Sequence, residues 1–94
     1  MIRSFTDKET ETIWLGIQSR RLPPSIQDKA LVKLALLNRA ASLADLRVPP
    51  ANRLEKLQGD RKGQYSIRIN EQWRICFVWK EGAAHGVEIT DYHA

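Results

Sequence analysis

The hydrophobic pattern of this chain changes its period once, near Arg53, and this change limits the possible folds more than any other feature. Before Arg53, apolar side chains recur at helical spacing, as at Ile26, Ala30, Leu34 and Leu37. After it, apolar and polar residues alternate in "RLEKL", "QYSIRI", "WRICFVW" and "VEITDY". The segments "QGDRKG", "NEQ" and "KEGAAHG", rich in turn-forming residues, separate these strands as loops. Because 94 residues provide one modest core, helices and strands must share it. We therefore expect one domain over residues 1–94, of the α+β class.

The N-terminal part predicts a short strand followed by a helix. Residues 2–5, "IRSF", alternate between apolar and polar side chains, as a strand does. Thr6 precedes Glu9 by three residues, the spacing of a capping box, and this predicts a helix over residues 7–19. The side chains expected to be buried by this helix are Ile13, Trp14 and Ile17.

A second helix is predicted over residues 25–42, because Ser25 is a favourable N-cap residue and the apolar stripe continues through this range. In the strand "WRICFVW", one phase is Trp73, Ile75, Phe77 and Trp79, and the other is Arg74, Cys76 and Val78. Helices can cover only one face of such an antiparallel sheet. We expect two layers, with an N-terminal strand and two helices packed on one face of a mainly antiparallel sheet. The other face should display Arg68 and Arg74.

The sequence lacks the features of several classes of protein. Cys76 is the single cysteine, so no internal disulfide can form, and its apolar neighbours indicate packing rather than catalysis. There is no glycine-rich phosphate loop, no histidine pair at helical spacing and no cluster of metal ligands, so we expect no metal and no other cofactor. No secretory leader and no stretch of roughly 18 apolar residues is present. These features favour a cytoplasmic protein that does not enter a membrane.

Positive charge is concentrated in the middle of the chain. The net charge is +4, whereas residues 46–80 contain eight basic and three acidic side chains, a local balance of +5. Such a distribution favours polyanions or acidic partner segments, and the planar guanidinium of arginine suits phosphate oxygens. The alternatives are a solvated surface, or ion pairs of Arg68 and Arg74 with a carboxylate such as Glu88.

Three proton-exchanging side chains, Asp91, Tyr92 and His93, directly follow the last strand pattern. If the strand stays extended, Asp91 and His93 lie on one side, about 6 to 7 Å apart, and Tyr92 lies on the other. A carboxylate at that distance favours the imidazolium form, so His93 could act as a general acid or base near neutral pH. The alternative is a frayed chain end.

The segments "RLEKLQGDRKGQYSIRIN" and "QWRICF", the start "MIRSF" and the final "DYH" resemble the HigB family of bacterial type II toxins, within the RelE/ParE superfamily. The resemblance covers essentially the whole chain. It implies a RelE-like fold and a toxin that enters the ribosomal A site, cuts mRNA and inhibits translation. It also implies a HigA-type helix-turn-helix antitoxin as partner, with operator DNA contacted only through the antitoxin complex. The cleavage in this family is metal-independent: the RNA 2′-hydroxyl attacks the adjacent phosphate and leaves a cyclic phosphate.

The resemblance also implies roles for individual residues. Arg74 would bind the scissile phosphate, and His93 would be the general acid or base. Asp91 would orient His93, while Tyr92 would stack on a base or donate a proton. The residues expected to bind RNA are Arg53, Lys56, Arg61, Lys62 and Arg68. Arg68 would assist Arg74, a role that charge and strand phase support rather than a motif.

One departure from the family pattern leaves alternatives open. Some members carry a histidine in the strand before the G-D-R turn, where this chain has Glu55 and Lys56. Either Glu55 serves as the base, or cleavage is slower or differently arranged. A weakly cleaving or non-cleaving toxin, acting mainly in a repressor complex with its antitoxin, therefore remains an alternative. Another is a ParE-like inhibitor of DNA gyrase, which needs no acid or base.

Overall fold

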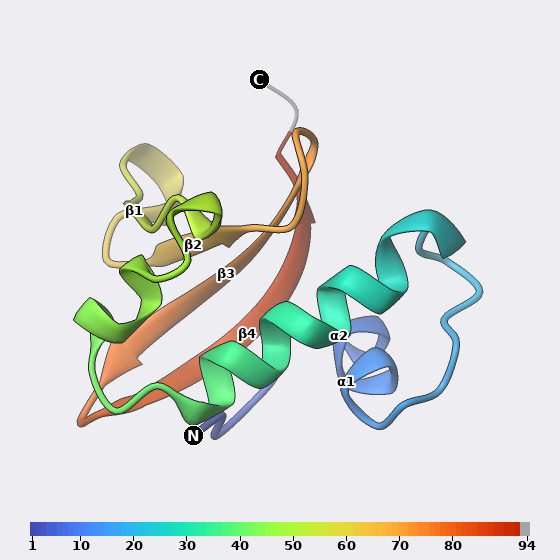
Figure 1. Ribbon diagram of the computed structural model, residues 1–94, viewed down its shortest axis with the longest axis horizontal. Helices are drawn as coiled ribbons and strands as arrows, with labels where there is room; N and C mark the ends of the chain where they lie inside the picture. Colours follow the sequence, from blue (N-terminus) through green and yellow to red (C-terminus); the bar gives the residue numbers. More distant parts are fainter. Residues whose placement is uncertain (93–94) are drawn as a thin grey trace.

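In the computed structural model, which describes residues 1–92, the chain folds into two α-helices and a four-stranded sheet (Figure 1). The helices are α1 (Lys8–Trp14) and α2 (Pro24–Arg39). The strands are β1 (Glu55–Lys56), β2 (Tyr65–Arg68), β3 (Trp73–Lys80) and β4 (Ala83–Asp91). They lie side by side in chain order, and each is antiparallel to its neighbours. Three short 3-10 helices, η1 (Leu43–Arg47), η2 (Pro50–Asn52) and η3 (Gly59–Arg61), lie in the connections.

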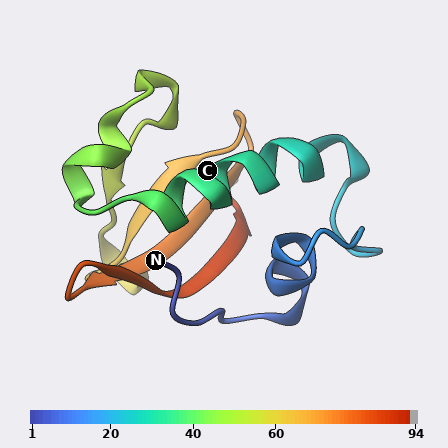
Figure 2. The ribbon, with the colours of Figure 1, turned by 60° about the horizontal axis from the view of Figure 1, so that its bottom comes forward.

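One face of the sheet packs against the helices. Figure 2 shows α2 lying across this face and α1 lying beside β4, and α2 contacts both β3 and β4. The α2 side chains Leu34 and Leu37 and the β3 side chains Ile75 and Phe77 are completely buried in the shared core. The predicted α+β architecture, with helices on one face of an antiparallel sheet, is confirmed.

The N-terminal segment runs alongside β4. Ile2 and Phe5 form isolated parallel bridges to Ala84 and Val87. The predicted first strand is therefore present only as two bridges, although it does add to the edge of the sheet.

Helix α1 ends earlier than predicted, at Trp14, because Gly16 stops it. Gly16 has a φ of 81°, and its N–H donates to the carbonyl of Ile13 at 2.9 Å. The N–H of Ile17 donates to the carbonyl of Thr12 at 3.1 Å, which completes a Schellman motif. The prediction that Ile17 is buried is wrong, since the chain has already left the helix and this side chain is exposed.

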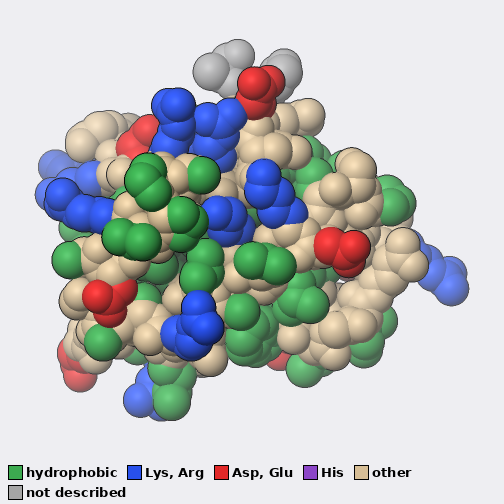
Figure 3. Space-filling model, viewed as in Figure 1, with side chains coloured by type: hydrophobic (Ala, Val, Ile, Leu, Met, Phe, Trp, Pro, Cys, Tyr) green, Lys and Arg blue, Asp and Glu red, His purple; other side chains and the backbone are tan. Residues whose placement is uncertain are grey.

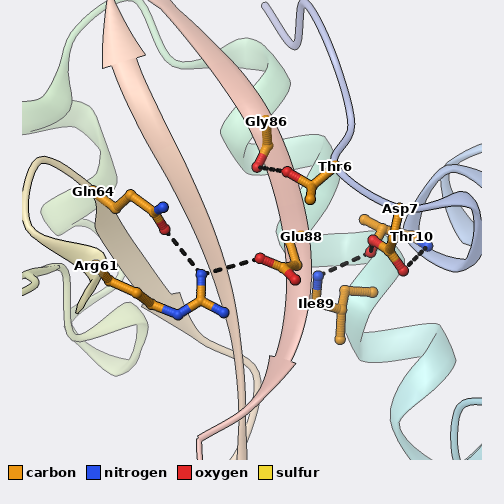
Figure 4. Close-up of polar contacts among 8 residues, drawn as sticks. All are labelled: Thr6, Asp7, Thr10, Arg61, Gln64, Gly86, Glu88 and Ile89. Atoms are coloured by element: carbon orange, nitrogen blue, oxygen red, sulfur yellow. Dashed lines mark hydrogen bonds and ion pairs between the residues drawn. The ribbon is translucent and has the colours of Figure 1, made fainter.

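The N-cap of α1 is Asp7, rather than the predicted Thr6. The Asp7 carboxylate accepts hydrogen bonds from the N–H of Thr10 at 3.4 Å and from its hydroxyl at 2.6 Å. The same Thr10 oxygen accepts the N–H of Ile89 at 2.9 Å, while the Thr6 hydroxyl donates to the carbonyl of Gly86 at 2.8 Å (Figure 4). These contacts fasten the start of α1 to β4.

Helix α2 is also shorter than predicted and has a different cap. It begins with Pro24 in its first turn, and Pro23 rather than Ser25 is the N-cap residue. It ends at Arg39, because Ala40 adopts an extended backbone conformation and residues 40–42 lead to η1. There the Asp45 carboxylate accepts the N–H of Ser42 at 3.2 Å in a capping box.

The β3–β4 connection is a two-residue turn, where the sequence predicts a longer loop. Glu81 and Gly82 both have positive φ, 53° and 72°, as a tight hairpin turn requires. Strand β4 therefore starts at Ala83. Gly86, predicted to lie in the loop, has a φ of 58° and lies in β4 where the pairing with β3 shifts register.

Candidate active site

The face of the sheet opposite α2 carries the candidate active site. Pairing places Ser66 opposite Cys76 and Cys76 opposite Glu88, while Arg74 lies opposite Thr90. All of these positions alternate with the core residues of their strands, so their side chains share the second face. Glu55 on β1 and Tyr92, directly after β4, border the same surface.

Arg74 is buried, with 7% of its surface exposed, which corrects the expectation that the sheet displays it openly. Its Nε donates to the Ser66 hydroxyl at 2.7 Å, and its Nη2 donates to the Arg53 carbonyl at 2.6 Å. The centre of its guanidinium lies 5.3 Å from the centroid of the Tyr92 ring, in a cation–π contact. These contacts fix the guanidinium plane while using only part of its five N–H donors.

Tyr92 connects Arg74 with Glu55. Its hydroxyl donates to Oε1 of Glu55 at 3.2 Å. The negative charge of Glu55 raises the pKa of Tyr92, and burial and this hydrogen bond act in the same direction. Tyr92 is the donor in this hydrogen bond, and Glu55 offers an exposed carboxylate. Glu55, Tyr92 and Arg74 form one contiguous group.

Asp91 points away from this group. It lies opposite Trp73, in the phase of the core residues, and its Oδ2 accepts a hydrogen bond from Nε2 of Gln72 at 3.1 Å. Of the two described residues of the "DYH" segment, Tyr92 alone reaches Arg74. His93 lies outside the described residues.

Arg61 in η3 forms an ion pair across the second face. Its Nη1 lies 3.0 Å from Oε1 of Glu88 and also donates to Oε1 of Gln64 at 3.0 Å (Figure 4). Glu88 thus pairs with Arg61, and not with Arg68 or Arg74. This pair holds the G-D-R turn over β3 and β4.

Four other residues are predicted to bind RNA, and they differ in exposure. The side chains of Arg53, Lys56 and Lys62 are exposed. Arg68 is half-buried, and its Nε donates to the carbonyl of Asn70 at 3.0 Å. All of them lie within the basic segment of residues 46–80.

Two contacts of Arg74, with the Ser66 hydroxyl and the Arg53 carbonyl, were not predicted from the sequence. Ser66 lies in the same phase of strand alternation as Arg68 and Arg74, and this pattern could have indicated the first contact. The Arg53 carbonyl was not foreseeable, since Arg53 follows η2 in a left-handed conformation, with φ of 44°. Among residues 1–92, no three histidine, cysteine, aspartate or glutamate side chains gather as metal ligands. In the same part of the chain, no helix has the length and apolar character needed to cross a membrane.

Residues 3–93 match the family of HigB-like toxins, described as the RelE-like toxin of type II toxin-antitoxin system HigB. Toxin HigB-1 of Vibrio cholerae serotype O1 is 44% identical over 85 residues, which cover 89% of this chain and 90% of the relative. Endoribonuclease HigB of Proteus vulgaris is 29% identical over 93 residues, covering 99% and 100%. The YoeB-YefM complex from Staphylococcus aureus matches in structure with a TM-score of 0.57 and 18% identity, over 100% of this chain and 99% of that chain, and supports the fold alone. The family match and the Vibrio cholerae relative show that this chain belongs to the HigB-like family of RelE-like toxins from type II toxin–antitoxin systems.

Proposed function

We propose that this toxin is a ribosome-dependent endoribonuclease that cuts mRNA in the A site and so inhibits translation. The observation that carries the proposal is the Arg74 guanidinium, fixed by Ser66 and Arg53 beside an exposed carboxylate–phenol pair. The relative from Proteus vulgaris is named an endoribonuclease and aligns over its full length, which supports the same activity.

The proposed chemistry uses the RNA's own 2′-hydroxyl as the nucleophile. Glu55 accepts the proton of this hydroxyl, and the oxygen attacks the adjacent phosphorus. Arg74 stabilises the negative charge that develops on the phosphate oxygens. The bond to the 5′ oxygen then breaks, and a general acid protonates the leaving oxygen. The products are a 2′,3′-cyclic phosphate and a 5′-hydroxyl end.

We assign the general acid to His93, following its place in the "DYH" segment, and keep Asp91 as the residue that orients it. Both assignments rest on the family pattern, since the Asp91 carboxylate accepts a hydrogen bond from Gln72 and lies on the other side of the strand from Tyr92. Tyr92 has a hydrogen-bond donor role, because its hydroxyl already donates to Glu55. Tyr92 is 38% exposed, and its ring offers a surface on which an RNA base can stack.

A type II toxin is held inactive by a protein antitoxin, and the family match assigns this chain such a partner. We propose that the antitoxin is a HigA-type helix-turn-helix protein, that operator DNA is contacted only through the complex, and that both act in the cytoplasm. Copurification of the toxin with the product of an adjacent reading frame tests the partner. An antitoxin that lacks a helix-turn-helix would contradict this assignment.

The test of the activity is to induce the toxin in cells and map RNA 5′ ends. New ends inside reading frames, absent after Arg74→Lys, are expected. Purified ribosomes programmed with mRNA should yield the cyclic phosphate, and a 2′-deoxy nucleotide at the scissile position should block cleavage. The exposed Arg20→Lys is the matched control. DNA damage with intact transcripts would contradict the proposal and favour gyrase inhibition, and intact transcripts without DNA damage would favour a non-cleaving toxin.

A further inference from the structure

A second basic region lies at the junction of α2, η2 and the end of β2, and its lining does not include Glu55, Tyr92 or Arg74. It is a hollow of about 360 Å³, and its lining includes the four cationic side chains of Lys29, Lys33, Arg53 and Arg68. Lys29 and Lys33 are one helical turn apart on α2 and share one face. Figure 3 shows that most Lys and Arg side chains on this side of the molecule lie in its upper half.

The positive charge of this hollow is poorly balanced. Glu71 is the single acidic side chain among the described residues of the lining, and no ion pair within residues 1–92 involves the four cations. Lys33 is 5% exposed, and its Nζ donates to Oδ1 of Asn52, a neutral partner. Burial, together with the charge of Lys29, lowers the pKa of the Lys33 ammonium. A buried ammonium among other cations is stabilised by an anion that enters from outside.

Arg53 joins this hollow to the candidate active site. Its side chain lines the hollow, while its carbonyl accepts the hydrogen bond from Arg74. One residue thus contributes to both places, and we expect an RNA strand with one phosphate at Arg74 to reach this cationic recess with a further phosphate. A chain of phosphates can occupy both positions.

We propose that the hollow bounded by Lys29, Lys33, Arg53 and Arg68 binds a second backbone phosphate of single-stranded RNA, distinct from the phosphate assigned to Arg74. The inference rests on the proposed function in taking RNA as the ligand. It makes Lys29 and Lys33, which lie on a helix outside the basic segment, part of the RNA-binding surface.

The test measures binding of a labelled 2′-O-methyl RNA of about ten nucleotides by fluorescence anisotropy. This probe has no free 2′-hydroxyl, so binding is recorded whether or not the protein cleaves RNA. The double variant Lys29→Gln/Arg68→Gln is expected to bind about tenfold more weakly, and the slope of log affinity against log salt should become shallower by roughly one unit or more. Arg20→Gln/Arg21→Gln removes the same charge from an exposed connection and should change affinity less than about twofold.

Two single variants keep the test sharp if the double variant loses its fold. Lys29→Glu changes an exposed helix position and should weaken binding, while Glu71→Gln removes the acidic side chain of the lining and should strengthen it. Equal losses for the Lys29/Arg68 and Arg20/Arg21 pairs would overturn the proposal. Unchanged RNA affinity with weaker antitoxin binding would also overturn it, in favour of an acidic protein segment. If mRNA is not cleaved on ribosomes but the selective loss of RNA binding is found, the proposed function fails and the phosphate site stands.

Discussion

At the residue scale, Arg74 is held by contacts that lysine cannot reproduce. A lysine keeps the charge, but it lacks the planar fork that reaches both the Ser66 hydroxyl and the Arg53 carbonyl. We predict that Arg74→Lys lowers the rate of cleavage of ribosome-bound mRNA by about a hundredfold or more. The loss of one buried hydrogen bond should reduce the free energy of unfolding by about 1–3 kcal/mol. Full cleavage by a folded Arg74→Lys protein would remove Arg74 from the mechanism.

The pairing of Tyr92 with Glu55 predicts a change in titration. Because the charge of Glu55 is the main cause of the raised pKa of Tyr92, Glu55→Gln should lower that pKa toward the ordinary value of tyrosine. The raised pKa of Tyr92 adds to the free energy of unfolding at pH values below the pKa that this residue has in the unfolded chain. This contribution is lost as the pH rises through the pKa of Tyr92 in the folded protein. Tyrosinate absorbance in a Tyr65→Phe background reports Tyr92 alone, since the chain has two tyrosines.

The control for this titration is Glu71→Gln, which removes a carboxylate that makes no contact with Tyr92 in the described structure. It should leave the titration unchanged. A Tyr92 pKa that does not respond to Glu55→Gln would contradict the contact. A loss of cleavage in Glu55→Gln together with the changed titration would support Glu55 as the base.

Strand alternation predicts part of this site and not the rest. It places Arg68 and Arg74 in one phase and separates Tyr92 from Asp91, as the structure does. It does not predict that Arg74 is buried, because the Arg53 carbonyl that holds it comes from a connection preceded by two prolines. Contacts made by irregular backbone depend on the packed fold rather than on local periodicity.

At the element scale, Thr10 links α1 to the sheet. Its hydroxyl donates to Asp7 and accepts the N–H of Ile89, and the side chain is completely buried. Thr10→Val keeps the shape but leaves the Ile89 N–H without its partner, so we predict a loss of about 1–3 kcal/mol in the free energy of unfolding. Thr12→Val is the matched control, because the Thr12 hydroxyl donates only to the carbonyl of Lys8 within the helix.

Denaturant unfolding measures the free energy of unfolding of both variants, and the rate of amide exchange at Ile89 shows where the structure is weakened. The exchange rate of this amide should rise in Thr10→Val and stay near the original value in Thr12→Val. Equal stabilities of the two variants would mean that the link to β4 contributes nothing.

The end of α1 gives a separate prediction. Gly16 adopts a positive φ that an L-residue with a Cβ occupies with strain, although a Cβ there would meet no atom within 4 Å. Gly16→Ala should therefore destabilise the fold by about 1 kcal/mol through backbone conformation alone. Gly16→Asn should cost less, since asparagine tolerates the left-handed region. Thermal unfolding of both variants tests this, and a neutral Gly16→Ala would contradict the assigned role.

The ends of the helices were difficult to predict because several residues offer competing signals. Thr6 and Asp7 are both capable caps, and the helix uses Asp7 while Thr6 binds the bulged part of β4. The predicted helix over residues 7–19 includes Gly16, whereas in the structure the helix ends before this residue. A residue's capping ability is thus decided by which partner the tertiary fold brings near it.

At the scale of the whole molecule, the change in period near Arg53 was enough to predict the layers. Alternating β3 and the stripe on α2 each present one apolar face, and these faces can be buried only against each other. The alternation did not give the strand lengths: β1 has two residues, and β4 begins before its alternating segment. The early start of β4 depends on a tight turn and a bulge, whose residues are of the kinds that also occur in longer loops.

This uneven sheet predicts uneven stability across the candidate active site. Glu55 lies on β1, a strand of two exposed residues at the edge of the sheet. Arg74 lies on β3, which also contains the completely buried residues Ile75 and Phe77. In hydrogen-exchange experiments, β3 amides should open with a free energy at least about 2 kcal/mol above that of β1 amides. A bound 2′-O-methyl RNA should slow amide exchange in β1 and leave exchange in the core of β3 unchanged. The reason is that the ligand would order Glu55, whereas Arg74 is already fixed in the free protein. Equal protection of β1 and β3 in the free protein would show that both halves of the site are equally rigid, and that Glu55 needs no substrate to be positioned.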